Sequence, residues 1–257
     1  MARLARRLAL MAGLWLAQAA GVQAASPFAD WSAVVVAGDW HAHDGAPTET
    51  FDNARRDVSA ALQRAGFRAE NLRQFSVRPE RYRDTRPAKT DLEGIYGAMA
   101  DLAPQTPGGC LVYLTSHGAP QGVLMDQRIL APQILAGMVD GACGEKPTVV
   151  VISACFSGVF VPYLAKPNRM VLTAARRDRS SFGCGEDDKY PYFDDCFLRA
   201  MPTAQDFATL GAGVKACVAA RELQERVSPP SEPQMFVGGV LRPMLPLLSF
   251  QAAAAQD

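Results

Sequence analysis

Short apolar runs, each ending at small or polar residues, recur along the chain. They are rich in β-branched residues and lack alternation with polar ones, which is typical of strands buried on both faces of a parallel sheet. Six strands are predicted, within residues 33–37, 71–76, 110–118, 148–158, 169–174 and 234–237.

Helical periodicity separates these runs. In residues 51–67, Val58, Leu62 and Ala65 fall on one helical face, and Gly66 ends the pattern. Further helices are predicted at 91–102, 131–140 and, as a pair, within 195–227, with a small hairpin at 122–127. Strands that alternate with helices indicate an α/β fold with right-handed crossovers.

Two strand ends carry candidate chemistry. The run TVVVISACFSG leads to Cys155, and CLVYLTSHG leads to His117 and Gly118. If the two strands are neighbours, their tips meet at the carboxyl edge, where open α/β sheets place their ligands. Either residue alone would more simply be a packed thiol or a loop histidine. Their ordered pairing instead predicts a Cys-His dyad for nucleophilic catalysis.

The residues around this dyad resemble those of the caspase-like cysteine peptidases, and within that group the legumain family (peptidase C13) in its short bacterial form. The similarity spans roughly residues 31–238. The matching motifs are Ser116-His117-Gly118-Ala119-Pro120, Ser153-Ala154-Cys155-Phe156-Ser157-Gly158, Thr173-Ala174-Ala175 and Ser180-Ser181-Phe182-Gly183-Cys184. The resemblance implies a three-layer sandwich, with a mostly parallel six-stranded sheet and helices on both faces.

The resemblance also implies roles for single residues. Cys155 would attack a carbonyl carbon, with His117 as general base or as the acid that protonates the departing amine. The main-chain N–H groups of Gly118 and Cys155 would stabilise the oxyanion. A helix beginning after Gly158 would direct its positive end toward the sulfur.

The specificity pocket departs from that of legumains, which use an Arg, a Glu and an Asp. The corresponding positions here are Asn53, Ser153 and Asp195, with Asp194 as an alternative register for the last. Ser180 and Ser181 match the pocket-wall serines. Since two of the three charges are missing, a preference for Asn in the substrate is not carried over. An inward Asp195 would favour a cationic P1 residue, whereas a carboxylate paired with a nearby Arg would favour small neutral ones.

Other chemistries have weaker signals. Ser157 lacks the first glycine of a G-x-S-x-G elbow, and the chain has no C-x-x-C pair and no phosphate-binding loop. His41, His43 and Asp44 form a lone H-x-H loop without a second ligand pair, so no metal and no cofactor are expected.

The N-terminus has the pattern of a secretory signal peptide over residues 1–25. Three arginines precede an apolar run that ends at small residues, and the run is too short to span a bilayer comfortably. Removing the three arginines leaves 23 basic against 26 acidic residues, a net charge of −3, which does not suggest a nucleic-acid partner. We therefore expect an exported protein without stable membrane insertion, made of one peptidase domain at 26–240 and a tail at 241–257. The resemblance to the short bacterial form implies that its compartment is the periplasm.

Six cysteines in an exported chain permit disulfides. With Cys155 reserved as nucleophile, at least one of the other five is unpaired. Cys110 and Cys143 precede the two catalytic strands and could sit side by side, while the pairing of Cys184, Cys196 and Cys217 is open.

The sequence thus predicts a cysteine endopeptidase that acts on a peptide or protein substrate. A transpeptidase using the same acyl-enzyme and a catalytically silent caspase-like binding or envelope-assembly module are the alternatives. The oligomeric state is left open.

Overall fold

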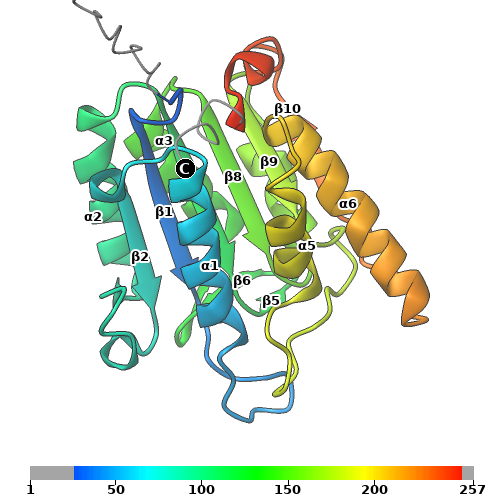
Figure 1. Cartoon of the computed structure of the whole chain (residues 1–257). Helices are drawn as coiled ribbons and strands as arrows, with labels where there is room; N and C mark the ends of the chain where they lie inside the picture. The colour runs from blue at the N-terminus through cyan, green and yellow to red at the C-terminus, as the bar shows by residue number, and fades with distance from the viewer. Residues whose placement is uncertain (1–25, 251–257) are drawn as a thin grey trace, which may run out of the picture.

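The computed structural model describes residues 26–250, so the predicted signal peptide at 1–25 lies outside the described residues. The described chain is built on one mixed sheet of seven strands (Figure 1). These are β1 Trp31–Ala37, β2 Leu72–Ser76, β3 Ala88–Lys89, β4 Gly109–Thr115, β8 Thr148–Ser153, β9 Arg169–Thr173 and β10 Gln234–Val237.

The strands lie in the order β10-β9-β8-β4-β1-β2-β3, and only β10 is antiparallel to its neighbour. All six predicted strands are present, and β3 is the seventh. Its two residues are exposed and pair with Phe75 and Ser76 at the edge of the sheet. An exposed strand of two residues has no periodicity, which is why the sequence predicts six.

Helices cover both faces of the sheet, which confirms the caspase-like α/β arrangement in three layers (Figure 1). Helices α1, α5 and α6 lie on one face, and α2, α3 and the short α4 on the other. The α-helices of the described residues are α1 Thr50–Arg64, α2 Leu92–Leu102, α3 Pro132–Cys143, α4 Val161–Leu164, α5 Tyr192–Ala200 and α6 Phe207–Gln224. Short 3₁₀ helices occupy Ala69–Asn71, Pro79–Arg81, Ala103–Gln105, Ser157–Phe160 and Leu245–Leu247.

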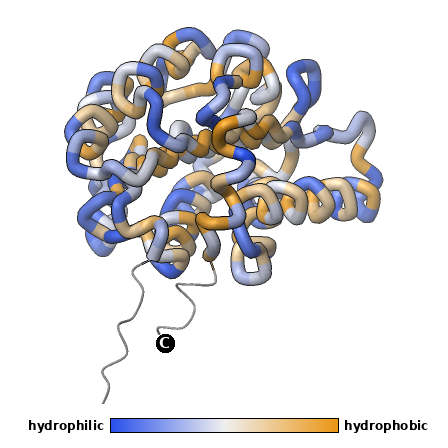
Figure 2. The backbone as a smooth tube through the Cα atoms, turned by 90° about the horizontal axis from the view of Figure 1, so that it is seen from above, coloured by the Kyte–Doolittle hydropathy of each residue, from blue (hydrophilic) through white to orange (hydrophobic). Residues whose placement is uncertain are grey.

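The strand side chains alternate between two hydrophobic cores. Val149 and Val151 of β8 face the core shared with α1, α5 and α6, whereas Val150 and Ile152 face the core shared with α2 and α3. Because both faces are covered, every residue of β1, β4 and β8 is buried. Figure 2 shows the resulting pattern, with hydrophobic segments gathered between the layers and hydrophilic turns outside.

A three-stranded antiparallel sheet adjoins the carboxyl end of β4. It consists of β5 Gly118–Ala119, β6 Gly122–Met125 and β7 Arg128–Leu130, so the predicted hairpin is confirmed. At the opposite end of the molecule, Leu241, Leu245 and Phe250 are buried in the same core as Phe28, which anchors residues 241–250 to the domain.

Two disulfides join elements within the described chain. Cys110 of β4 pairs with Cys143 at the end of α3, and Cys196 of α5 pairs with Cys217 of α6. Cys155 and Cys184 are free. None of the described helices is long and apolar enough to cross a membrane.

Candidate active site

The tips of β4 and β8 bring the two predicted catalytic residues to one edge of the sheet. Thr115 pairs with Ser153 in the parallel register, and Ser116 N–H donates to the Ser153 carbonyl at 3.1 Å. His117 and Cys155 each follow two residues after that pair. Beyond the strands the chains stay in contact, because a Cβ on Gly118 would lie only 2.0 Å from the Cys155 carbonyl oxygen.

A tight turn presents the Cys155 thiol. Phe156 adopts a left-handed conformation with φ of 56°, and its N–H donates to the Arg179 carbonyl at 2.8 Å. This reversal leaves Cys155 half-buried at the strand end. Its Sγ accepts a hydrogen bond from the Ser181 N–H at 3.2 Å and lies 3.6 Å from the Ser181 hydroxyl. The helix expected after Gly158 is a 3₁₀ turn at Ser157–Phe160 followed by the single turn of α4.

The His117 ring is oriented by the loop after β1. Its Nε2 lies 2.9 Å from the His41 carbonyl oxygen. Since a carbonyl only accepts hydrogen bonds, Nε2 carries the proton, and Nδ1 keeps the lone pair that can take a proton from a thiol. Phe51 of α1 packs edge-on against the ring at a centroid distance of 5.0 Å.

The N–H of Gly118 points away from the hairpin. Leu124 N–H donates to the His117 carbonyl at 2.9 Å, which makes His117 and Leu124 a hydrogen-bonded antiparallel pair. The next pair, Gly118 with Val123, is then a non-hydrogen-bonded one, whose N–H groups face outward. The Gly118 N–H is therefore a main-chain donor that the pairing with β6 does not use.

Ser153 and Asp194 meet beneath the strand tips. Asp194 of α5 is completely buried, and its carboxylate accepts hydrogen bonds from Thr115 at 2.7 Å, from Ser153 at 2.9 Å and from the Tyr113 hydroxyl. Burial raises the pKa of Asp194 to about 6, although the three hydroxyl donors act in the opposite direction. Desolvation of the buried phenol raises the pKa of Tyr113, and the neighbouring Asp194 carboxylate raises it further.

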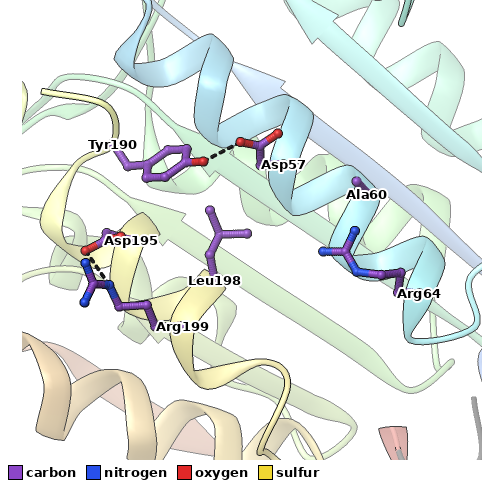
Figure 3. A pocket seen from close by; sticks show the side chains of 7 residues that line it. All are labelled: Asp57, Ala60, Arg64, Tyr190, Asp195, Leu198 and Arg199. Atoms are coloured by element: carbon purple, nitrogen blue, oxygen red, sulfur yellow. Dashed lines mark hydrogen bonds and ion pairs between the residues drawn. The ribbon is translucent and has the colours of Figure 1, made fainter. Parts of the chain in front are cut away.

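The Asp195 side chain lies away from the cluster of Thr115, Ser153 and Asp194. Its carboxylate makes ion pairs of 2.9 Å with Arg199 and with Arg221. It lines a hollow of about 350 Å³ between α1 and α5, on the outer side of the helical layer (Figure 3). Successive residues of a helix point about 100° apart, so the alternative register, Asp194, is the one that faces the strand tips.

The remaining predicted pocket residues divide into two groups. Ser181 touches the sulfur, as described above, and Ser180 precedes it on the surface. Asn53 donates from Nδ2 to the Lys189 carbonyl at 3.3 Å and lines a polar hollow of about 420 Å³ with Glu49 and Arg78. Asn53 therefore joins α1 to the loop before α5, and its amide is not part of the cluster around Asp194.

Comparison with known proteins identifies the class of this site. No curated protein sequence matches the chain. Residues 102–219 match the model of the Peptidase C13 family. The fold is similar to the crystal structure of caspase-1 from Spodoptera frugiperda, with a TM-score of 0.58 and 15% sequence identity over 84% of this chain and 89% of that chain. The chain is a cysteine peptidase that is similar to the C13 family over 118 of its 257 residues.

Several features of this site could not be predicted from a residue pattern. The acceptor for His117 is a main-chain carbonyl, which any residue at position 41 would supply. Cys184 is the second free thiol of the described residues, and desolvation, together with the nearby Cys155, raises its pKa to about 11. Its thiol is therefore almost entirely protonated at neutral pH.

The histidines of the loop after β1 make other contacts. His41 Nδ1 lies 2.8 Å from the Asp39 carboxylate, and the His43 N–H donates to the Cys184 carbonyl at 3.2 Å. Within residues 26–250, no three His, Cys, Asp or Glu side chains are grouped closely enough to hold a metal ion.

Proposed function

We propose that this cysteine peptidase is an exported endopeptidase in which Cys155 is the nucleophile and His117 the acid–base residue. The observation that carries the proposal is the adjacency of two strand tips in register, one ending in a half-buried free thiol and the other in an oriented imidazole. The main-chain approach of Gly118 to Cys155 supports it.

The chemistry follows from the atoms in place. The Cys155 thiol gives its proton to His117 Nδ1, and the sulfur attacks the substrate carbonyl carbon. The Gly118 N–H stabilises the oxyanion, and the amine leaves with the proton from His117 to give a thioester. Water then attacks the thioester while His117 takes its proton, which releases the acid and restores the thiol.

The P1 pocket is proposed to accept neutral side chains. Asp195 is ion-paired with two arginines. The Asp194 carboxylate is buried and already accepts hydrogen bonds from hydroxyl groups. A cationic side chain would meet no free carboxylate from either residue. Small neutral polar P1 residues are therefore expected to be favoured, with Ser181 as the donor and acceptor nearest the sulfur.

Export to the periplasm remains a proposal based on the N-terminal pattern. Two disulfides within the described chain support it, because disulfides persist in oxidising compartments and are rare in a reducing cytosol.

Peptide-library cleavage by the purified protein tests the proposal. Cys155→Ala and His117→Ala should each lower the rate at least about 1,000-fold without loss of folding, because the dyad acts as a unit. Cys184→Ala is the matched control and should keep the activity, since that protonated thiol cannot replace Cys155. Activity that persists in Cys155→Ala would end the thiol mechanism, and Arg outpacing Ser and Asn at P1 by about tenfold would refute the neutral pocket.

A further inference from the structure

The loop after β1 is fixed at its first residue. Gly38 N–H donates to the Thr115 carbonyl at 2.9 Å, and its own carbonyl accepts from Asp126 N–H at 2.7 Å. A Cβ at this position would lie 2.2 Å from the Leu124 carbonyl oxygen. The main chain at Gly38 is therefore held between the tip of β4 and the hairpin, with no space for a side chain.

Asp39 then shapes the next two residues. Only 5% of Asp39 is exposed, and its Oδ1 accepts hydrogen bonds from the N–H groups of Trp40 at 2.6 Å and His41 at 3.2 Å. The same oxygen lies 2.8 Å from His41 Nδ1. Burying a carboxylate costs free energy unless hydrogen-bond donors surround it. These contacts offset that cost and hold the main chain of the turn in one conformation.

The segment held in this way ends at the His117 ring. The His41 carbonyl accepts the hydrogen bond from His117 Nε2 at 2.9 Å. The path from Asp39 to the His117 imidazole thus runs through the main chain of His41, while the His41 side chain is 41% exposed and packs at a tilt against Trp40.

We propose that Asp39 is the positioning residue of the dyad, acting on His117 through the main chain of His41. By fixing the N–H groups of residues 40 and 41, it directs the His41 carbonyl at Nε2 and so sets both the tautomer and the ring angle. Such a contact matters because misplacing a catalytic group by about 1 Å can cost about 100-fold in rate. The inference rests on the proposed function of Cys155 and His117.

The test compares wild type with four variants on two substrates with one acyl peptide, which carries the P1 residue selected in the library. One substrate is the aminomethylcoumarin amide, whose leaving group needs a proton, and the other is the thiobenzyl ester, which leaves as a thiolate. Asp39→Ala should lower kcat for the amide about 10- to 100-fold, lower kcat for the thioester by a smaller factor and leave KM unchanged.

Two further variants distinguish an effect through the His41 main chain from an effect of the Asp39 charge or the His41 side chain. Asp39→Asn should recover amide kcat to within about threefold of wild type, because its Oδ1 still accepts from both N–H groups. His41→Ala should also stay within about threefold, since it keeps the carbonyl. Asp44→Ala is the matched control, because Asp44 accepts the Ala46 N–H in the same loop at 3.1 Å but is exposed, and it should be unchanged.

The outcomes are distinct. Equal losses on both substrates without recovery in Asp39→Asn would overturn the positioning role, as would a wild-type kcat in Asp39→Ala. A loss of kcat in His41→Ala as large as in Asp39→Ala would show that the His41 side chain carries the effect, and it would overturn the main-chain route. A wild-type protein inactive on both substrates would refute the proposed function itself.

Discussion

A methyl group on Gly118 would collide with the main chain of Cys155. The added Cβ would lie 2.0 Å from the Cys155 carbonyl oxygen, a main-chain atom that cannot rotate away. Gly118→Ala should therefore separate the two strand tips and misdirect the proposed oxyanion donor. We expect kcat for peptide hydrolysis to fall at least about 100-fold, the loss typical of one missing oxyanion donor.

The control for Gly118→Ala is a glycine with free space around it. A Cβ on Gly137 of α3 would have no neighbour within 4 Å, so Gly137→Ala should keep the activity and gain up to about 1 kcal/mol of stability. Steady-state kinetics and urea unfolding of both variants check the pair. Wild-type kcat in a folded Gly118→Ala protein would show that the strand tips tolerate separation.

Some residues of the site could be placed from the sequence, and others could not. The position of Cys155, His117 and Gly118 at neighbouring strand ends could be predicted, because an apolar run followed by small residues is a strong pattern. Asp194 and Asp195 could not be separated, because a helix start uncertain by one residue rotates the side chain by about 100°. The His41 carbonyl and its support by Asp39 arise from main-chain geometry, which residue types do not encode.

At the scale of elements, Asp194 ties helix α5 to β4 and β8. Its carboxylate accepts from Thr115 and Ser153, which lie two residues before His117 and Cys155 respectively. One carboxylate thus joins a covering helix to both strands that end at the proposed dyad. The apolar runs are sufficient to predict the long strands. The two residues of β3 and the rotation of α5 about its axis depend on tertiary contacts and could not be predicted.

The Asp194 contact predicts how stability changes with pH. Its pKa is about 6 in the folded protein and 3.8 as the ordinary value, so the folded state holds the proton more tightly. The contribution to stability is therefore greatest below pH 4, falls as the pH rises toward 6 and is constant above. The loss is about 3 kcal/mol, from about two pKa units at 1.4 kcal/mol each.

Urea unfolding of wild type and Asp194→Asn at pH 4 and pH 7 measures this loss. Asparagine stays neutral at both, so the stability difference between the two proteins should move by about 2 kcal/mol in favour of the variant as the pH rises, because part of the full loss lies below pH 4. Asp195→Asn is the control from the same helix, where surface ion pairs contribute up to about 1 kcal/mol. An unchanged difference at both pH values would mean that Asp194 is ionised at pH 4.

At the scale of the whole molecule, one disulfide ties a helical layer to the sheet and the other joins two helices within the opposite layer. Cys110–Cys143 joins the sheet to α3 across 33 residues, and Cys196–Cys217 joins α5 to α6 across 21. They lie on opposite faces of the sheet, in separate cores. Each closes a loop of the unfolded chain, so each should stabilise the protein by about 3 to 4 kcal/mol.

Replacing either pair by alanines tests both the pairing and the compartment. Each double variant should lose about 3 to 4 kcal/mol in urea unfolding, and wild type should lose both contributions after reduction. Mass mapping should find these two pairs, with Cys155 alkylated in the native protein and Cys184 only slowly, because its pKa of about 11 leaves little thiolate at pH 8. A stability loss below about 1 kcal/mol in both double variants would mean that the fold does not depend on its disulfides. The disulfides would then no longer support export to an oxidising compartment.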